Sequence, residues 1–358
     1  MDKNAKIYVA GHRGLVGSAI WNNLIARGYT NLIGKTHYEL DLMDGVAVAR
    51  FFAEEQPEFV FLAAAHVGGI IANNKYRAGF IYRNLQIQNN VIGESWRNSV
   101  KKLLFLGSTC IYPKDAPQPM QEDALLTGPL EYTNEPYAIA KIAGLKMCES
   151  FNLQYGTNFI AVMPTNLYGP NDNFDLERSH VLPAMVRKMH LANALMKGDW
   201  DAIRKDLDSR PIEGLSGQKS NQEITDLLGK YGITESQLWL WGTGKPMREF
   251  LWSEEMADAC VYIMEKVGFN DLKGTGSEVR NCHINIGTGK EISIRDLAYL
   301  IKETTGYTGE ILFDDSKPDG TMRKLTDVTK LNSLGWKHAI EIAEGVRRMY
   351  NWYLNDLD

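Results

Sequence analysis

The sequence of 358 residues lacks most features that mark exported, membrane-spanning and metal-binding proteins. Its four cysteines form no Cys-x-x-Cys pair, so they predict neither a zinc knuckle nor a dithiol redox motif, and we expect no metal. No apolar run approaches the about 20 residues that cross a bilayer. Residues Met1–Lys6 also lack the pattern of a signal peptide. We therefore expect a cytoplasmic protein with no membrane partner.

The charge balance excludes a broad basic surface. The formal net charge is -5 and the sequence pI about 5.9, so we expect no nucleic-acid partner, and an anionic ligand would need a local cluster of cations. Hydrophobic residues make up 44% and charged residues 23%, which is typical of a globular chain and excludes a disordered one. The length allows one large domain and a smaller one.

Short apolar runs alternate with helical stretches through the first half of the chain. The expected strands are 7–10, 32–33, 59–63, 103–106 and 159–163, and the expected helices are about 15–27, 43–54, 80–98 and 137–155. Alternation at this spacing predicts the α/β class, with a Rossmann-type, doubly wound parallel sheet and helices on both faces.

A glycine-rich loop joins the first expected strand to the first expected helix. It has the spacing Gly-x-x-Gly-x-x-Gly and runs through Gly11, His12, Arg13, Gly14, Leu15, Val16 and Gly17. The first glycine allows a tight turn, the second lets a pyrophosphate approach the backbone, and the third lets the helix pack close to the sheet. The helix start then directs N–H groups at the phosphates, so the loop predicts dinucleotide binding.

The end of the second expected strand indicates which dinucleotide is bound. NAD sites usually carry a carboxylate there for the ribose 2′-hydroxyl, whereas this chain reads Gly34-Lys35-Thr36-His37. Lys35 and Arg13 could instead meet a 2′-phosphate, so we expect NADPH. Asp41 is a candidate neighbour of the adenine.

A tyrosine and a lysine four residues apart give the second chemical signal. Tyr137 and Lys141 share one face of the expected helix, so the ammonium can lie near the phenol. Such a tyrosine can donate a proton to a carbonyl oxygen as hydride arrives. Ser108, just past the fourth expected strand, can hydrogen-bond the same oxygen.

These features together resemble the extended short-chain dehydrogenase/reductase family, and within it the GDP-L-fucose synthases. The resemblance covers nearly the whole chain except about 195–237. It is carried by the segments Gly11–Gly14, Ala65–Ile70, Gly107–Pro113, Pro164–Pro170, His180–Ala184, Met247–Phe250 and Lys317–Thr321.

The resemblance implies conversion of GDP-4-keto-6-deoxy-D-mannose to GDP-L-fucose, by epimerisation at C3 and C5 and then reduction at C4 with NADPH. It implies Cys110 as the base and His180 as the acid of epimerisation. An extended backbone from Ser108 to Cys110 would direct both side chains to one side. The other implied cofactor contacts are Leu106, Gly107, Lys141, Pro164, Thr165, Asn166, Leu167 and His180. The implied substrate contacts are Lys188, Trp241, Arg248 and Asp319.

The implied organisation is a nucleotide domain and a substrate domain in a homodimer. We expect the NADP-binding domain over 1–165 plus about 239–267, where the chain would return to the sheet. The substrate domain would comprise about 166–238 and 268–358, with helices near 223–230, 292–305 and 340–354. The polar stretch near 195–237 is an expected insertion without an assigned role.

Two other classes remain open on sequence grounds. One is another sugar-nucleotide epimerase or dehydratase of the same fold, although dehydratases usually carry an acidic residue after the catalytic Ser/Thr, where this chain has Cys110. The other is a non-catalytic dinucleotide sensor, a class that tends to lose the Tyr137 and Lys141 pair.

Overall fold

The computed structural model describes residues 1–317 and 319–357, and the chain divides into two compact units. Unit 1 comprises Met1–Leu167, Glu249–Lys290 and Leu325–Ala339, and unit 2 comprises Tyr168–Arg248, Glu291–Lys324 and Ile340–Asp358. Both units are therefore assembled from segments far apart in the sequence, and each is described separately below.

Unit 1 is built on a six-stranded, wholly parallel sheet with the strand order β10-β5-β4-β3-β1-β2. The strands are β1 (Ile7–Ala10), β2 (Leu32–Ile33), β3 (Phe59–Leu62), β4 (Lys102–Leu106), β5 (Phe159–Pro164) and β10 (Ile284–Ile286). The predicted α/β class and the parallel sheet are confirmed. The sixth strand lies at 284–286. The segment expected to return to the sheet, about 239–267, adds no strand to it: residues 239–248 belong to unit 2, and the remainder contributes the helix Ser253–Lys266 to unit 1.

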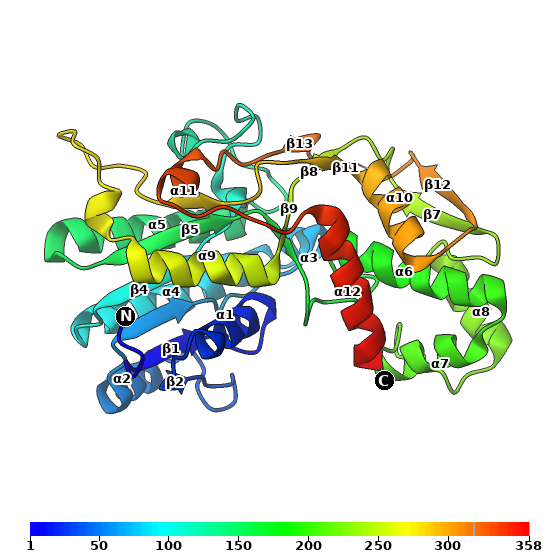
Figure 1. Ribbon diagram of the computed structural model, residues 1–358, viewed down its shortest axis with the longest axis horizontal. Helices are drawn as coiled ribbons and strands as arrows, with labels where there is room; N and C mark the ends of the chain where they lie inside the picture. Colours follow the sequence, from blue (N-terminus) through cyan, green and yellow to red (C-terminus); the bar gives the residue numbers. More distant parts are fainter. Residues whose placement is uncertain (318, 358) are drawn as a thin grey trace. The chain divides into compact units, whose positions relative to one another are not determined.

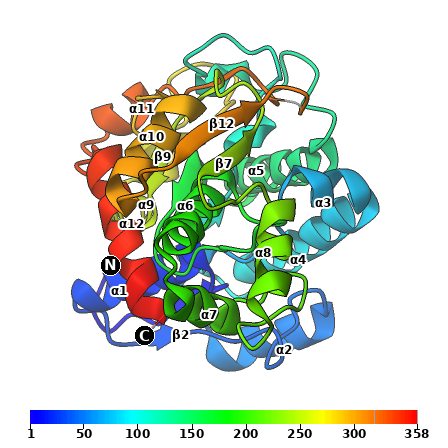
Figure 2. The same cartoon turned by 90° about the vertical axis from the view of Figure 1, so that its right-hand side faces the viewer.

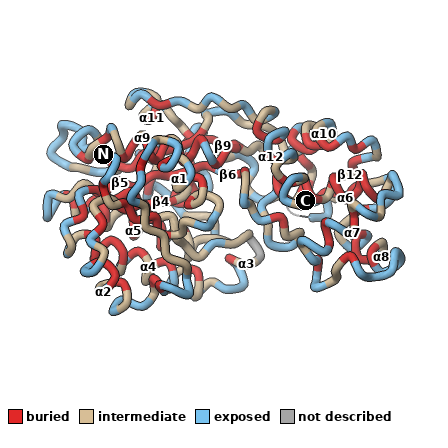
Figure 3. The backbone as a smooth tube through the Cα atoms, turned by 60° about the horizontal axis from the view of Figure 1, so that its bottom comes forward, coloured by how far each residue is buried: buried red, intermediate tan, exposed pale blue. Residues whose placement is uncertain are grey.

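Helices cover both faces of this sheet (Figure 1). One face carries α1 (Leu15–Ala26) and α9 (Ser253–Lys266), and the other carries α2 (Gly45–Glu55), α4 (Arg77–Arg97) and α5 (Glu135–Tyr155). Successive strand residues alternate between the two apolar clusters, as Tyr8 packs with α2 while Val9 packs with α1 and α9. Burial on both faces explains why these strands read as continuous apolar runs (Figure 3).

Local capping sets several helix boundaries. The Asp44 carboxylate accepts the N–H groups of Val46 and Ala47 at 2.9 and 3.1 Å, which places the start of α2 two residues after the expected position. Gly156 ends α5 with a left-handed backbone at φ 68°. The predicted helices of the first half are confirmed to within a few residues.

Unit 2 consists mainly of helices beside two small sheets (Figure 2). Its helices are α6 (Val181–Lys197), α7 (Trp200–Ser209), α8 (Asn221–Lys230), α10 (Ile294–Thr305) and α12 (Ile342–Leu357). One sheet pairs β7 (Gln237–Trp241) with β12 (Glu310–Asp314), and the other joins β11 (Ile292–Ser293), β8 (Met247–Arg248) and β13 (Arg323–Lys324). The insertion near 195–237 thus contains two short helices, α7 and α8, joined by the connection over 210–220.

A buried ion pair attaches this insertion to the rest of unit 2. Arg187 on α6 donates to Asp206 on α7 at 2.8 and 3.0 Å, and both side chains are almost fully buried. The second oxygen of Asp206 accepts the hydroxyl of Tyr353 on α12. The pair therefore fixes α7 against two helices, and removing one partner would leave a buried charge.

The remaining elements are short connections. They are α3 (Ile70–Lys75), α11 (Thr329–Ser333), β6 (Asn166–Tyr168), β9 (Phe250–Trp252) and the 3₁₀ helices η1 (Thr109–Ile111), η2 (Glu122–Ala124) and η3 (Phe269–Asp271). No helix among the described residues is long and apolar enough to cross a membrane.

Candidate active site

The candidate site of unit 1 lies at the carboxyl ends of the parallel strands, where open α/β sheets place their ligands. The loops that follow β1, β4 and β5 carry the glycine motif, Ser108 and Thr165, respectively. Residues from distant parts of the sequence therefore meet at one edge of the sheet because the strands are parallel.

The glycine loop has the close approaches that its spacing predicts. Gly11 has a φ of 84°, and a Cβ at Gly17 would lie 2.0 Å from the Gly11 carbonyl oxygen, so a side chain there would force α1 away from β1. Gly14 precedes α1, and no side chain within the described residues caps the helix start. This loop and helix start suit a pyrophosphate.

His12, inside the glycine loop, packs against the end of the second strand. Its ring lies 5.4 Å from that of Trp21, and a Cβ at Gly34 would lie 2.5 Å from the His12 ring. Burial, followed by the charge of Arg13, lowers the pKa of His12. The ring is therefore neutral near pH 7 and closes one side of the loop.

The turn after β2 contains a carboxylate that we did not expect there. Glu39 accepts the N–H and the hydroxyl of Thr36, both at 2.7 Å, and these bonds, with the charges of Lys35 and Arg13, lower its pKa. The structure therefore brings both expected cations toward Glu39. Its signal in the sequence was the Thr-x-x-Glu spacing of a capping turn. Asp41 is exposed and accepts the N–H of Met43 at 2.9 Å, so its visible role is to stabilise a turn.

Ser108 and Cys110 lie in a short helical turn. Ser108 has an extended backbone and its Oγ accepts the N–H of Cys110 at 3.3 Å, while Thr109–Ile111 form η1. The expectation of an extended chain through Cys110 was wrong, because the serine caps a 3₁₀ turn that the alternation rule does not foresee. Cys110 is buried and is a thiol, as are the other three cysteines.

Helix α5 brings its tyrosine and lysine to the same thiol. The charge of Cys110 acts on both Tyr137 and Lys141, raising the pKa of each, but burial is the larger effect. Burial lowers the pKa of Lys141 to about 8, and it raises the pKa of Tyr137. Tyr137 is therefore a protonated phenol near pH 7, the form that can donate a proton.

Lys141 occupies a fixed position. Its Nζ donates to the Leu106 carbonyl oxygen at 2.7 Å and lies 5.6 Å from the centre of the Tyr137 ring. Leu106 is the last residue of β4, and it is followed by Gly107, where a Cβ would lie 2.3 Å from the sulfur of Met163. The strand, the helix and the neighbouring strand thus pack too closely to let the ammonium move freely.

The segment after β5 is tied to a buried carboxylate residue. Thr165, which follows Pro164, donates its hydroxyl to the Glu249 carbonyl oxygen at 3.4 Å, and the Asn166 amide donates to the same oxygen at 2.8 Å. Leu167 packs on the apolar cluster of α1 and α9.

The side chain of Glu249 anchors two further segments. Its carboxylate is fully buried and accepts the N–H groups of Thr288 and Gly289 at 2.6 and 2.7 Å and that of Thr326 at 3.0 Å. Sequence reasoning gave Glu249 no role, because only the fold reveals that three segments meet there.

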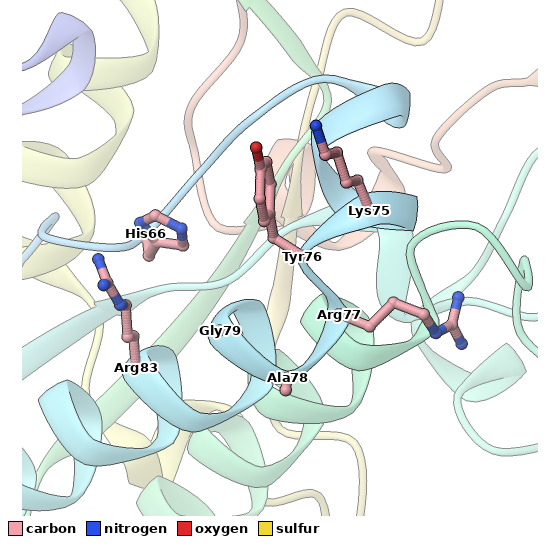
Figure 4. A pocket seen from close by; sticks show the side chains of 7 residues that line it. All are labelled: His66, Lys75, Tyr76, Arg77, Ala78, Gly79 and Arg83. Carbon is pink, nitrogen blue, oxygen red and sulfur yellow. The ribbon is translucent and has the colours of Figure 1, made fainter.

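A shallow pocket adjoins the loop after β3. The ring of Phe80 lies 4.7 Å from His66 and 6.4 Å from Tyr137, so the pocket lies beside the candidate site. Figure 4 shows Arg83 directed toward His66, while Arg77 points away and donates to the Tyr132 carbonyl oxygen at 2.7 Å. The pocket is lined by His66, Lys75, Tyr76, Arg77, Ala78, Gly79 and Arg83.

The candidate residues of unit 2 fall into two groups. Asp319 accepts the N–H and hydroxyl of Thr243, both at 2.7 Å, and its charge acts on Arg248, whose pKa is lowered by burial. Trp241 ends β7 and is largely exposed. Arg248 and Lys324 are partners in the β8 and β13 pairing, so Arg248, Lys324 and Asp319 are grouped together.

The second group lies on helix α6. His180 directly precedes α6 and is exposed. Lys188 donates from Nζ to the Tyr231 carbonyl oxygen at 2.7 Å, and burial lowers its pKa to about 8. The neighbouring Arg187 is committed to Asp206 and is therefore not available to a ligand. Within the described residues no group of three His, Cys, Asp or Glu side chains could hold a metal ion.

The comparisons with known proteins agree with this geometry. Residues 7–210 match the family described as "NAD dependent epimerase/dehydratase family". The chain is 49% identical over 356 residues to GDP-L-fucose synthase 1 of Arabidopsis thaliana, covering 99% of this chain and 95% of the relative. It is 48% identical over 353 residues to GDP-L-fucose synthase of Escherichia coli, covering 99% and 98%.

A solved structure extends the comparison. GDP-mannoheptose C4 reductase from Campylobacter jejuni, with NADP bound, is 46% identical and superposes with a TM-score of 0.88, covering 99% of both chains. The similarity therefore spans both units, including the segment near 195–237. This chain belongs to the NAD dependent epimerase/dehydratase family, and within it groups with the GDP-L-fucose synthases.

Proposed function

We propose that this protein converts GDP-4-keto-6-deoxy-D-mannose to GDP-L-fucose by epimerising C3 and C5 and then reducing the C4 ketone with NADPH. The observation that carries the proposal is that Tyr137, Lys141 and Cys110 lie together. Lys141 Nζ is 5.6 Å from the centre of the Tyr137 ring, and a Cys110 thiolate raises the pKa of both. A reductase needs only the tyrosine and lysine, whereas an epimerase also needs a base. The curated relatives that carry the name GDP-L-fucose synthase support this substrate.

The cofactor is NADP(H), held by the glycine loop with Arg13 and Lys35 at the 2′-phosphate. The glycine geometry and the two cations beside Glu39 fit such a group. Structures of relatives with NADP bound support the assignment. When bound, the cofactor supplies the hydride for C4. Leu106, Gly107, Pro164, Thr165, Asn166 and Leu167 would border it, since they follow β4 and β5 at the same sheet edge.

The residues of unit 1 divide the proton chemistry between them. The Ser108 hydroxyl and the Tyr137 phenol hydrogen-bond the C4 oxygen and stabilise the enolate that forms when a neighbouring carbon loses its proton. The Cys110 thiolate takes that proton, and His180, which belongs to unit 2, returns one to the carbon. Tyr137 finally protonates the C4 oxygen during reduction, and the Lys141 ammonium supports the phenolate that remains.

The residues of unit 2 would bind the GDP-sugar. Lys188 and Arg248 would meet the diphosphate, because charge-assisted bonds to phosphate are the strong ones. Trp241 presents an exposed ring on which the base or the sugar can stack. Asp319 orients the loop beside Arg248 through its two bonds to Thr243.

We further propose a cytoplasmic homodimer. The four cysteine thiols support the compartment. Exposed apolar side chains on α4 and α5, namely Tyr82, Ile139, Leu153 and Tyr155, support a second copy on this face. Light scattering of the purified chain tests the dimer, and a monomer that remains fully active would contradict it.

The decisive experiment separates epimerisation from reduction. The enzyme, Cys110→Ser and Tyr137→Phe are each incubated in deuterated water with GDP-4-keto-6-deoxymannose, and label at C3 and C5 is read by mass spectrometry or NMR. Cys110→Ser should lose the label, because a serine hydroxyl is a far poorer base than a thiol. Tyr137→Phe should lose reduction by about 10²–10⁴-fold while cofactor still binds.

Three outcomes contradict the proposal. Normal labelling by Cys110→Ser removes the base assignment. Near-normal turnover by Tyr137→Phe shows that another group delivers the proton. A GDP-4-keto heptose turned over in preference to the six-carbon ketone would assign the chain to the heptose reductases, one of which it matches at 46% identity.

A further inference from the structure

A buried polar network lies directly behind the segment that carries Ser108 and Cys110. Its members are Tyr112, His283 and Asn285, which are 3%, 1% and 0% exposed. The Tyr112 hydroxyl donates to Asn285 Oδ1 at 2.5 Å and lies 2.9 Å from His283 Nε2. Burying polar groups this deeply costs free energy unless each is hydrogen-bonded, so the three side chains depend on one another for their partners.

The hydrogen bonds assign the protons of the network. The phenol has one hydrogen, and Asn285 Oδ1 accepts it, so the remaining contact must be His283 Nε2–H donating to the phenol oxygen. Burial, with the charges of Lys330 and Lys146, lowers the pKa of His283 to about 3, so its ring is neutral and carries one N–H. Tyr112 is thus held from both sides.

The far end of the network is fixed in the sheet. Asn285 is the middle residue of β10 and lies opposite Met163 of β5. Its N–H donates to Glu122 Oε1 at 3.1 Å, and its amide donates to the carbonyl oxygens of Met120 and Asp327 at 3.0 and 3.2 Å. With these bonds in place the Oδ1 acceptor has little freedom to follow a moving tyrosine.

The near end is two residues from the candidate base. Tyr112 is the C-terminal cap of η1 and donates its N–H to the Thr109 carbonyl oxygen at 3.4 Å, while Cys110 donates its N–H to Ser108 Oγ. This 3₁₀ turn is three residues long, so where Tyr112 lies largely decides where the Cys110 thiol and the Ser108 hydroxyl point.

We propose that Tyr112 is a positioning residue, which through its hydroxyl bonds to Asn285 and His283 holds the η1 turn so that the Cys110 thiol and the Ser108 hydroxyl face the substrate ketone. The proposal rests on the proposed function for the identity of that ketone. Tyr112 does not contact the reacting atoms. A displacement of about 1 Å at a reacting group can cost about 10²-fold in rate. Loss of the Tyr112 hydroxyl can therefore slow the reaction although it does not contact the substrate.

The test compares two tyrosines in unit 1 that each lose only an oxygen. Tyr112→Phe leaves Asn285 Oδ1 and His283 Nε2–H without their partner. Tyr29→Phe is the matched control, because Tyr29 is 2% exposed and its hydroxyl donates to Glu265 at 2.5 Å, on the other face of the sheet. Each variant is assayed for thermal stability, NADPH affinity, deuterium incorporation at C3 and C5, and iodoacetamide labelling of Cys110.

We expect Tyr112→Phe to slow deuterium incorporation about 10- to 100-fold and to change the labelling rate of Cys110, with NADPH affinity unchanged. Tyr29→Phe should incorporate deuterium and label Cys110 at the wild-type rates despite a similar loss of stability. Equal incorporation and equal labelling in the two variants would overturn the proposal.

Two further arms keep the result decisive. If Tyr112→Phe does not fold, His283→Leu removes the donor on one side while keeping the bond to Asn285, and a smaller loss of incorporation in the same direction is expected. Unchanged incorporation and labelling in that variant would overturn the proposal. If the wild-type enzyme incorporates no deuterium, the proposed function fails, and the labelling of Cys110 still tests the positioning role.

Discussion

Two lysines, the buried Lys141 in unit 1 and the half-buried Lys188 in unit 2, make the same kind of hydrogen bond in different surroundings. Lys141 and Lys188 each donate to a main-chain carbonyl oxygen at 2.7 Å, and burial lowers the pKa of each to about 8. The carbonyl that Lys141 contacts belongs to Leu106, the last residue of β4, which is a central strand of the sheet. The carbonyl of Lys188 belongs to Tyr231, at the end of α8 in the insertion.

The mobility of each lysine ammonium therefore depends on which residue supplies the carbonyl oxygen that it contacts. Moving Lys141 requires a shift of β4 or α5, which pack in one core cluster, whereas moving Lys188 requires only a displacement of α8. A fixed ammonium suits a reaction that needs one geometry. An ammonium that can exchange a carbonyl oxygen for a phosphate oxygen suits ligand binding.

The largest expected effect separates the two lysines directly. Lys141→Met should lower the kcat of reduction about 10²–10⁴-fold, because Tyr137 loses the charge that supports its phenolate. Lys188→Met should instead raise the KM for the GDP-sugar about 10- to 100-fold and leave kcat nearly unchanged, as expected for one lost bond to a charged group. Steady-state kinetics of both variants provide the measurement. The comparison breaks down if the two substitutions change the same parameter.

The next effect concerns the attachment of the insertion. Asp206→Ala leaves the Arg187 guanidinium buried without its carboxylate, which should lower the free energy of unfolding by about 3–5 kcal/mol in urea titrations. Glu278→Ala, which removes an exposed pair with Arg280, should cost no more than about 1 kcal/mol and serves as the control. If Tyr231 positions Lys188, Asp206→Ala also raises the KM for the GDP-sugar. An unchanged KM would show that α8 is held independently of α7.

A smaller effect tests the cations at the cofactor end of unit 1. Replacing Arg13 and Lys35 by glutamine should weaken NADPH by about 1.5–3 kcal/mol for each lost charged bond and change NADH affinity much less. Fluorescence titration of each cofactor measures this. Equal losses for both cofactors would mean that the two cations only support the turn around Glu39.

The smallest effect is a difference in pH dependence. The pKa of Lys141 is about 8 in the folded protein and near 10.4 when exposed, so between about pH 8 and 10 the unfolded chain binds more protons. This group alone makes stability rise with pH through that window, by at most about 1.4 kcal/mol per pH unit. The free energy of unfolding of the wild type, minus that of Lys141→Met, should therefore increase between about pH 8 and pH 10. A constant difference would show that Lys141 is not desolvated.

The sequence predicted unit 1 well because local signals and the fold agree there. Strands buried on both faces read as apolar runs, and the glycine loop and the Tyr137 and Lys141 pair are short motifs whose geometry is nearly determined by spacing. The turn at Cys110 was predicted wrongly, because a serine cap overrode the extended backbone. The role of Glu249 was missed, because its partners at Thr288 and Thr326 are close only in the folded chain.

Unit 2 was less predictable for the same physical reason. Its stability depends on pairs such as Arg187 with Asp206, 19 residues apart, and Asp206 with Tyr353, 147 residues apart, which leave no periodic pattern. Helix α8 has a capping box at Ser220 and Glu223 and could be predicted in part. The bond from Lys188 to Tyr231 could not, because a backbone acceptor has no residue preference.

The segmented sheet of unit 1 constrains how the protein is made on the ribosome. Strand β10 and the residues 325–339 join the same unit as β1, so its last pieces leave the ribosome only after nearly all of unit 2 has been synthesised. The edge of β5 lacks its partner until β10 at 284–286 has emerged, and unpaired strand edges favour aggregation. Fragments that stop before β10 should therefore depend on chaperones, whereas chains that include β10 and the residues 325–339 should be released from them.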